Sequence, residues 1–347
     1  MHPGISHEIS QKVKNMSLLC ALLVVSIHVS WPQEPLSAGW FICNAVKDGY
    51  ARIAVPFFFA VSGFFLAGHF GEAGWWKREV GKRVRTLMVP FLIWSLVALV
   101  ASVPLSIIAD FIAHRPFGTN IYILHDSNWL RVFGLDLTDY PLHVPLWYVR
   151  CLFFFAVTGA LFDRGVRTFR YAWLGGLFLF LLAANHIPDE NVREFFRMGY
   201  SAAGMFYFSV GVFIRRIGLK GKVPPHVAVL CGVVGFALVA ARLVFVYHGW
   251  RGSIMLGKLC TPLLICFTWH FMTARRIPDW LTACSFPIFL MHTVVFPYFA
   301  VVLKRLALGE LAQTGVMYVG GVVGSIVVAV LLRRFCPKVS AVVFGGR

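Results

Sequence analysis

Long apolar runs alternate with short polar segments along the whole chain. Ten of the runs are long enough to cross a hydrocarbon core of about 30 Å as an α-helix, which rises about 1.5 Å per residue. The pattern predicts an all-α fold, namely a polytopic membrane protein with about ten transmembrane helices. We place these helices at residues 15–33, 52–71, 86–110, 144–162, 169–188, 199–217, 226–248, 254–273, 283–303 and 314–333.

The composition is typical of a protein that is embedded in lipid. Hydrophobic residues make up 59% of the chain and charged residues 14%, whereas soluble domains hold about 25% charged residues. We expect a single transmembrane domain over residues 1–347, without a soluble appendage. The first apolar run has no small-residue cleavage pattern, so we interpret it as the first span and not as a signal peptide.

Positive charge is divided unevenly between the predicted loops. A net charge of +17 would indicate a nucleic-acid partner in a soluble protein, but membrane topology explains it better here. With the N-terminus in the cytoplasm, the segments on that side carry 20 Lys and Arg residues and the opposite segments carry 8. The positive-inside rule therefore predicts that both termini are cytoplasmic.

Acidic residues and cysteines limit the possible chemistry. Carboxylates are nearly absent from the predicted spans, and only Asp110 lies near the end of one. This disfavours a carboxylate-dyad hydrolase, a Ser-His-Asp hydrolase and a proton pump built on Asp or Glu. The eight cysteines show no CxxC or Cys/His metal spacing, so we expect no metal and no structural disulfide.

Several titratable residues interrupt the apolar runs at comparable depth, and these are His28, Arg52, Arg150, Lys258 and His292. An arginine at the membrane centre costs roughly 2.5–3.5 kcal/mol on insertion scales, so such residues usually face a protein interior or a wet cavity. We expect Arg52 to begin the second helix at its outer mouth, where Pro56 frees the Arg52 carbonyl and bends the helix. Arg242 lies near the end of a span, where a long side chain snorkels to the interface.

The residue types favour acyl transfer to a hydroxyl. Histidine has an ordinary pKa of about 6.5, which suits a general base near neutral pH, and such a base typically contributes about 10²–10⁴-fold. Arginine suits a phosphate, a carboxylate or a developing oxyanion. On the predicted inner side, GEAGWWKREVGKRVR contains Lys82, Arg83 and Arg85. These cations either set the topology and attract anionic lipid or capture a cytosolic phosphorylated donor.

Five segments together resemble the acyltransferase-3 family of integral membrane acyltransferases. RIAVPFFFAVSGFFL, which contains Arg52 and Ser62, closely matches the second-helix signature of the family and is the most specific segment. LLVVSIH resembles the end of the first helix, and KRVRTLMVPFLIWS resembles the basic loop before the third helix. PLWYVRCLFF resembles the Leu-Trp-Phe/Tyr block through Trp147 and Tyr148, and SFPIFLMH resembles the late block that ends in His292.

The chain departs from the family pattern in two basic motifs. The family usually has an arginine eleven residues before its essential histidine, which is His28 here, and this chain has Ser17 at that position. Lys14 lies about one helical turn earlier on a similar face, and whether it takes over is open. The cytosolic Arg-x-x-Arg motif is replaced by Lys82-x-x-Arg85.

The resemblance implies an O-acyltransferase of the bacterial inner membrane. It implies an acyl-CoA donor, most often acetyl-CoA, taken from the cytosol as a co-substrate, with no bound cofactor. It implies a cell-envelope glycan or a lipid-linked sugar as the acceptor. The chain resembles the standalone form of the family, which lacks a C-terminal extracytoplasmic domain.

The resemblance also assigns roles to residues of this chain. It makes His28 the general base, and Arg52 the residue that positions His28 or the thioester carbonyl. Lys82, Arg83 and Arg85 are expected to hold the donor phosphates. The residues expected to bind substrate are Trp147, Tyr148, Arg150, His292, Ser62 and Lys14. For His292, a structural role stays equally open.

A transporter or flippase of an acylated sugar or a small anion is the alternative. Ten helices with proline-broken spans and intramembrane cations are also typical of transporters, although the sequence shows no inverted repeat. A catalytically silent relative of the family is a third possibility, which Ser17 raises. Transfer or hydrolysis of acyl-CoA by detergent-purified protein separates these classes, because transport needs a sealed compartment.

Overall fold

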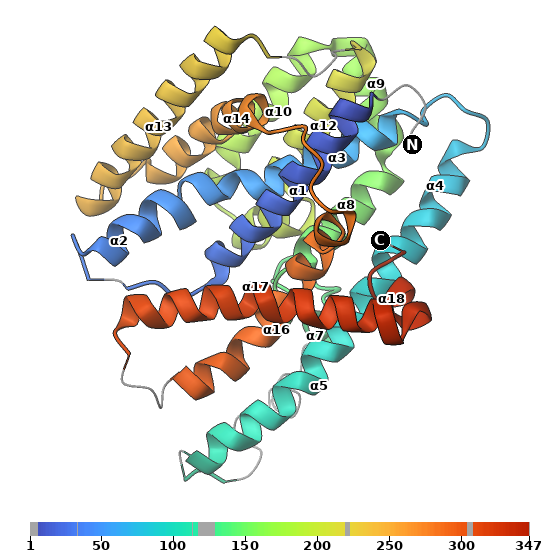
Figure 1. Cartoon of the computed structure of the whole chain (residues 1–347). Coiled ribbons are helices and arrows are strands. Elements are labelled where there is room, and N and C mark those ends of the chain that lie inside the picture. Colours follow the sequence, from blue (N-terminus) through green and yellow to red (C-terminus); the bar gives the residue numbers. More distant parts are fainter. Residues whose placement is uncertain are drawn as a thin grey trace.

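The structure, a computed structural model, describes residues 6–32, 34–112, 114–116, 129–218, 223–303 and 308–346. Within these ranges the chain forms helices and turns and contains no β-strand, which confirms the all-α fold class (Figure 1). The helical elements are α1 (His7–His28), α2 (Ala38–Ile42), η1 (Cys43–Lys47), η2 (Tyr50–Ile53), α3 (Ala54–Ala67), α4 (Trp75–Arg83), η3 (Val84–Met88), α5 (Val89–Ile112), α7 (Trp129–Val132), α8 (Leu146–Val157), α9 (Gly159–Phe169), α10 (Tyr171–Ala183), η4 (Ala184–His186), α11 (Glu190–Glu194), η5 (Phe195–Gly199), α12 (Ala202–Arg216), α13 (Pro225–Tyr247), α14 (Ser253–Phe271), α15 (Asp279–Thr282), α16 (Ser285–Leu303), α17 (Glu310–Phe335) and α18 (Pro337–Val343).

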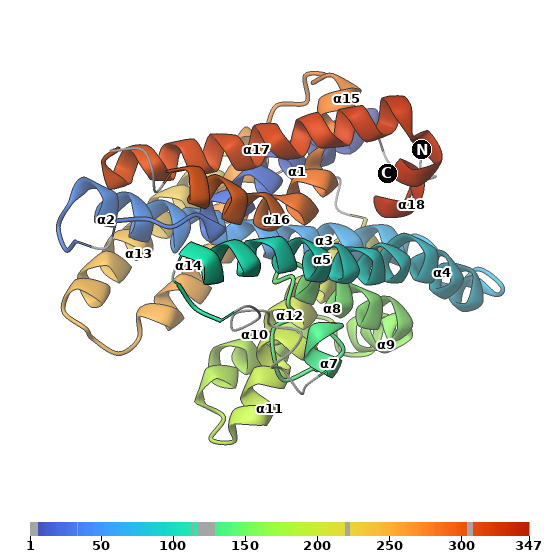
Figure 2. The same ribbon diagram turned by 90° about the horizontal axis from the view of Figure 1, so that it is seen from below.

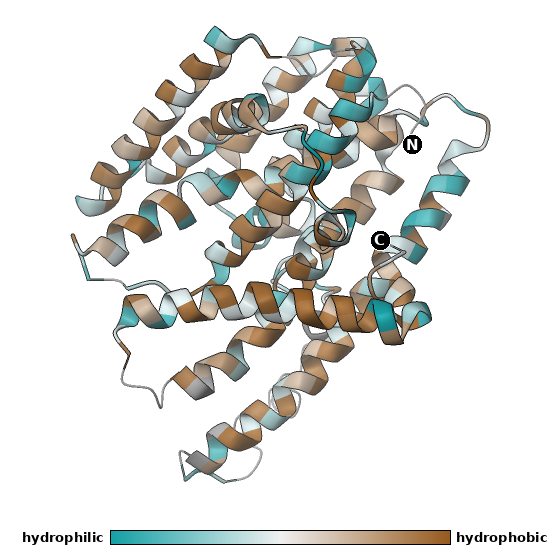
Figure 3. Ribbon diagram, viewed as in Figure 1, coloured by the Kyte–Doolittle hydropathy of each residue, from teal (hydrophilic) through white to brown (hydrophobic). Residues whose placement is uncertain are grey.

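Every predicted span overlaps a helix of the structure, but fewer of these helices meet the requirements for crossing a membrane alone. In the described residues, five helical stretches are long and apolar enough, and they are Ala38–Ala67, Trp75–Ile108, Pro225–Tyr247, Ser253–Phe271 and Glu310–Phe335. The pair α8 and α9 provides a sixth if it is one span. Figure 3 shows that α1 begins with hydrophilic turns and continues as an apolar helix. The count of ten therefore stays a prediction.

The second predicted helix differs from the structure in where it begins. The helical stretch runs over Ala38–Ala67, with π and 3-10 turns at η1 and η2 before α3. Arg52 therefore lies near the middle of this stretch and not at its outer mouth, so that prediction is wrong. The backbone is irregular just before α3, where the Arg52 amide donates to the Gly49 carbonyl in the 3-10 pattern, at 3.4 Å. The bend that was expected from Pro56 stays a prediction. Pro56 follows within the first turn of α3.

The fourth predicted helix is broken into two. The span predicted at residues 144–162 ends at Val157, and α9 leaves α8 at an angle of 65°. Thr158 occupies the break, where its hydroxyl donates to the Phe154 carbonyl and bonds the Tyr200 hydroxyl at 2.6 Å. The side chain of Thr158 thus links the bend to Tyr200, the residue that follows η5. The apolar pattern of the sequence does not predict this contact.

The backbones of α3 and α12 touch where glycines face the neighbouring helix. A Cβ atom at Gly63 would lie 2.1 Å from the Phe208 carbonyl oxygen, and one at Gly211 would lie 1.8 Å from the Ala60 carbonyl oxygen. Neither contact is possible for a larger residue without moving a helix. Small residues at helix interfaces allow such close approach in membranes, so this pair forms the tightest part of the helical core.

The ends of the helices are sorted between two sides of the molecule. Figure 2 shows the start of α1, the end of α17, α4 and α9 on one side, and α2 with the end of α13 on the other. The basic helix α4 lies on the side where α1 begins. This arrangement fits the predicted sidedness, in which both termini and the basic loop are cytoplasmic, and the orientation in a membrane stays a prediction.

Candidate active site

Two predicted site histidines come into contact inside the helical core. His28 is the last residue of α1, because Val29 turns to an extended conformation. The His28 ring centroid lies 5.1 Å from that of His292 on α16. His292 is completely buried, and Phe296 packs edge-on against its other side with ring centroids 5.6 Å apart. The first and ninth predicted spans therefore do bring their histidines together.

The hydrogen bonds of His292 define which of its nitrogens can accept a proton. Its Nδ1 lies 2.9 Å from the Ile288 carbonyl oxygen. A carbonyl only accepts, so Nδ1 carries the hydrogen and Nε2 carries the lone pair. Among the described residues, this buried Nε2 has no hydrogen-bond partner. An unpaired buried nitrogen beside a second imidazole is a group that a substrate or a protonated His28 can satisfy.

A third histidine, which the sequence analysis did not select, holds α16 in place. His143 is buried, and its Nε2 donates to the Leu290 carbonyl at 2.7 Å. Its Nδ1 then accepts from the Thr293 hydroxyl at 3.1 Å. His143 thus binds α16 on both sides of His292. The only signal in the sequence is its place between Pro141 and Pro145, directly before α8.

Arg52 lies near the histidines without a direct bond to either. Its guanidinium forms an ion pair with Asp48, one helical turn earlier, and its side chain is 50% exposed. The charges of Arg52 and Lys47 act on His28 electrostatically. Arg52 also lines a cavity of about 510 Å³, to which His28 does not contribute. Arg52 thus lines that cavity and acts electrostatically on the imidazole of His28.

Aromatic side chains of α3, α8 and α16 pack together, and Trp147 and Tyr148 are among them. The predicted substrate-binding roles of these two residues stay predictions. Tyr148 is buried and lies 4.8 Å from Phe59, 6.0 Å from Phe58 and 5.3 Å from Phe289, measured between ring centroids. Trp147 packs against Phe59 at 6.2 Å. These rings join α3, α8 and α16 into one apolar wall beside the histidines.

The guanidinium of Arg150 is hydrogen-bonded to backbone carbonyls and does not line a described cavity. Its two terminal nitrogens donate to four carbonyls, those of Gly134, Asp136, Asp139 and Met198. Only its Nε–H group is left without a partner among the described residues. The predicted substrate-binding role of Arg150 stays untested, but the geometry favours a structural role that holds the segment before α8.

Lys14 and Ser62 lie on different helices, Lys14 near the start of α1 and Ser62 on α3. Lys14 is half exposed and pairs with Asp279 at 2.9 Å, which joins the start of α1 to α15. The hydrogen bond from Lys14, together with the nearby Arg276, lowers the pKa of the Asp279 carboxyl from 3.8 to about 2. Ser62 is partly buried on α3. Their predicted roles in substrate binding stay predictions.

Asn15, which the sequence analysis passed over, is the buried polar residue next to Lys14. Its side-chain amide donates to the Thr273 and Arg275 carbonyls at 2.8 and 2.9 Å. Asn15 therefore fixes the N-terminal half of α1 against the segment that follows α14.

The basic segment that was predicted to hold donor phosphates contains one buried carboxylate. Glu79 lies 3.5 Å from Arg83 and 3.9 Å from Lys82. Arg85 is exposed and makes only a long hydrogen bond, 3.4 Å, to the Gly81 carbonyl. Of the three predicted donor-binding cations, Arg85 is therefore the one whose charge is least compensated within the described part of the chain.

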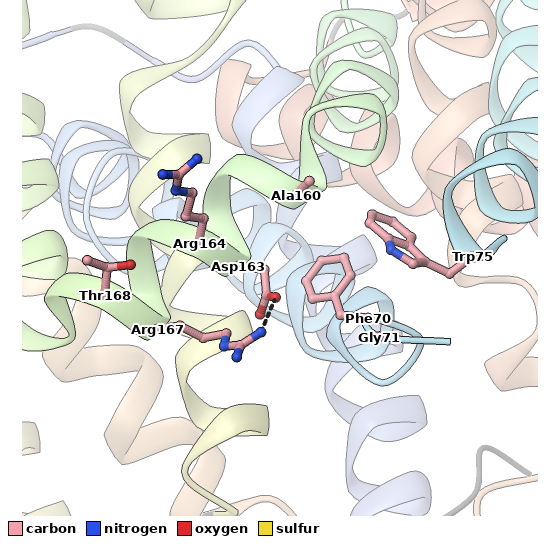
Figure 4. A pocket seen from close by; sticks show the side chains of 8 residues that line it. All are labelled: Phe70, Gly71, Trp75, Ala160, Asp163, Arg164, Arg167 and Thr168. Atoms are coloured by element: carbon pink, nitrogen blue, oxygen red, sulfur yellow. Dashed lines mark ion pairs between the residues drawn. The ribbon is translucent and has the colours of Figure 1, made fainter. Parts of the chain in front are cut away.

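A cavity of about 370 Å³ lies beside the start of α4, against α9 (Figure 4). Phe70 and Trp75 form one wall as an edge-to-face pair with ring centroids 4.7 Å apart. Arg167 points toward Asp163, 3.9 Å away. Arg164 is exposed and points away from that pair. Aromatic surface and two arginines are thus available on the side of the molecule that carries the basic helix.

The described structure shows neither a disulfide nor a cluster of metal-ligating side chains. None of the eight cysteines is in a disulfide. Within the described ranges, no three His, Cys, Asp or Glu side chains come close enough to hold a metal ion.

Apolar helices of membrane length indicate a membrane protein, whose helical core holds the contact between His28 and His292. The chain belongs to the acyltransferase-3 family, whose model, described as an acyltransferase domain, matches residues 15–334. Membership of this family indicates that the protein is a membrane acyltransferase. No curated protein and no solved structure matches the chain.

Proposed function

We propose that this protein transfers an acyl group, in the first place acetyl, from acyl-CoA to a hydroxyl of a cell-envelope glycan or a lipid-linked sugar. We place this activity in the bacterial inner membrane. The observation that carries the proposal is the contact between His28 and His292, with the lone pair of His292 Nε2 buried and unpaired. The family match to residues 15–334 supports the reaction class.

In this mechanism His28 acts as the general base. A ring nitrogen of His28 takes the proton from the acceptor hydroxyl while the hydroxyl oxygen attacks the thioester carbonyl. The carbon–sulfur bond then breaks, and the CoA thiolate takes the proton back from the His28 imidazolium. The products are the O-acyl ester and CoA with a free thiol. A positioned base of this kind typically contributes about 10²–10⁴-fold.

The neighbours of His28 prepare it for this role. The Ile288 carbonyl holds His292 so that its lone-pair nitrogen is the one left free. His143 fixes the two residues of α16 that flank this position, Leu290 and Thr293. An imidazolium formed at His28 therefore has a buried acceptor beside it. Arg52 supplies positive charge for the tetrahedral oxyanion, as preorganised cations do in acyl transfer.

The donor is bound on the side of the molecule that carries α4. Lys82, Arg83 and Arg85 hold the phosphates of CoA, with Arg85 contributing the least compensated charge. The cavity beside Phe70 and Trp75 offers aromatic surface to the nucleotide base. Arginine and lysine are the side chains that bind phosphate most strongly, which supports this assignment.

Replacing His28 by Ala tests the proposal. We expect acyl transfer from radiolabelled acetyl-CoA in isolated membranes to fall by at least about 10²-fold, the lower end of the contribution of a general base. His226→Ala is the matched control, because His226 is exposed at the start of α13. Mass spectrometry of envelope glycans from both strains identifies the acceptor. Normal turnover by correctly inserted His28→Ala protein would remove His28 from the mechanism.

A further inference from the structure

The cavity that Arg52 lines carries an excess of positive charge. Five cationic side chains line it and two carboxylates oppose them, and these residues are Arg52, Arg193, Arg197, Arg242, Lys258, Asp48 and Glu194. The excess is three positive charges in a space of about 510 Å³. Pockets that bind small molecules have volumes of about 300–1,000 Å³. This cavity is therefore large enough to hold a charged sugar.

The two carboxylates of the cavity form ion pairs with arginines that lie outside α13 and α14. Asp48 pairs with Arg52. Glu194 lies 3.2 Å from Arg197 and 3.9 Å from Arg193. Arg197 is 56% exposed and Arg52 is 50% exposed, so this part of the cavity opens to the surface. Asp48 also acts electrostatically on Arg242, but among the described residues neither carboxylate of the cavity forms an ion pair with the two remaining cations.

The two remaining cations, Arg242 and Lys258, lie on the apolar helices α13 and α14. Arg242 donates to the Asn44 carbonyl at 3.3 Å, and Lys258 donates to the Leu181 carbonyl at 2.6 Å. Neither meets a carboxylate oxygen within the described ranges of the chain. Cations inside apolar spans are costly and mark substrate pathways. Backbone carbonyls orient these two charges but do not neutralise them.

We propose that this cavity binds an anionic group, a phosphate or a carboxylate, on the acceptor sugar. The proposal rests on the proposed function, because it places the acceptor on the Arg52 side of His28. The Arg52 charge acts on His28, so an acceptor anchored at Arg242 and Lys258 extends past Arg52 toward the base. Guanidinium and ammonium groups are the natural partners of both anions.

Neutral polar groups complete the lining of the cavity. Asn185, Tyr207 and Thr261 line the same space. The Thr261 hydroxyl donates to the Gly257 carbonyl at 2.8 Å, so its oxygen can still accept a hydrogen bond. Such groups suit the hydroxyls of a sugar ring. The combination of fixed cations and neutral hydrogen-bonding groups is that of a site for an acidic carbohydrate.

Binding of inorganic pyrophosphate and of glucuronate to detergent-purified protein tests the proposal without any acyl transfer. Isothermal titration at low ionic strength is the measurement, with Lys258→Met and Arg242→Gln as the variants. We expect each variant to weaken binding at least tenfold and Lys258→Arg to restore it. Arg251→Gln, which removes an exposed charge outside the cavity, is expected to bind as the wild type does. Size-exclusion profiles establish that each variant is folded.

The outcomes separate this proposal from the proposed function. Arg85→Ala alters the donor phosphates' site, so the Lys258-dependent part of pyrophosphate binding must persist in it. Tighter binding of pyrophosphate than of glucuronate identifies a phosphorylated acceptor, and the reverse identifies an acidic sugar. Equal binding of both probes by folded wild-type, Lys258→Met and Arg242→Gln proteins would overturn the anion site. Binding that depends on Lys258, without acyl transfer, would retain the anion site and reject the enzyme.

Discussion

Replacing Arg150 tests whether its hydrogen bonds to backbone carbonyls stabilise the fold. It is 2% exposed and donates to four backbone carbonyls, two of which belong to buried hydrogen bonds at Gly134 and Met198. The other two bonds, to Asp136 and Asp139, are partly buried. Arg150→Met keeps an unbranched apolar stem and removes every donor.

The magnitude follows from the carbonyls that lose their partner. A buried acceptor left unsatisfied costs about 1–3 kcal/mol, so the two buried bonds, to Gly134 and Met198, together give about 2–6 kcal/mol. Water can replace the donor at the two partly buried carbonyls, so we add nothing for them. Proteins have free energies of unfolding of about 5–15 kcal/mol, so this loss is a large share of the total.

The measurement is unfolding of the purified protein in mixed micelles with increasing SDS. We expect the free energy of unfolding of Arg150→Met to fall by about 2–6 kcal/mol, with Arg150→Lys between it and the wild type, because lysine reaches fewer carbonyls. The substrate-binding role makes the opposite prediction. An unchanged free energy of unfolding together with a raised KM for the acceptor would refute the structural reading of Arg150.

Two further predictions concern the side of the molecule where α1 begins. Arg85→Ala should raise the KM for acyl-CoA several-fold with little change in kcat, because it removes a phosphate contact, and steady-state kinetics with varied acyl-CoA measure this; an unchanged KM would reject the phosphate-clamp assignment. Since Lys14 lowers the pKa of Asp279 to about 2, their ion pair stabilises the fold above about pH 4 and loses this effect as the pH falls toward 2. Asp279→Asn should therefore have a slightly lower unfolding midpoint than the wild type at pH 5 and a smaller difference at pH 2, where the folded-state carboxyl is half protonated, whereas an equal difference at both values would contradict the linkage.

The apolar pattern located the helices well because burial in lipid requires long hydrophobic runs. It placed the start of the second helix too late, at residue 52, because Lys47 and Asp48 interrupt the apolar run there. In the structure the Arg52–Asp48 pair lies within the helical stretch, which continues through these charges. Charged residues that neutralise each other one turn apart do not end a helix, and composition alone cannot reveal such pairing.

The site was predictable only where its residues lie within apolar runs. His28 and His292 were selected for this reason, and the structure brings them together. His143 lies outside such a run, and its partners on α16 are about 150 residues away in sequence, so nothing local indicated its role. Arg242 was interpreted as snorkelling, yet it lines the cation-rich cavity with Lys258. Only the tertiary contacts show whether such a cation reaches the membrane interface or lines a cavity.

The glycine contacts between α3 and α12 have a consequence for how the protein works during turnover. Two helices whose backbones touch at Gly63 and Gly211 have no side-chain layer through which one can slide past the other. They form a fixed strut, with the aromatic wall attached to it through Phe59. Any relative movement of helices must therefore take place around this strut and not within it.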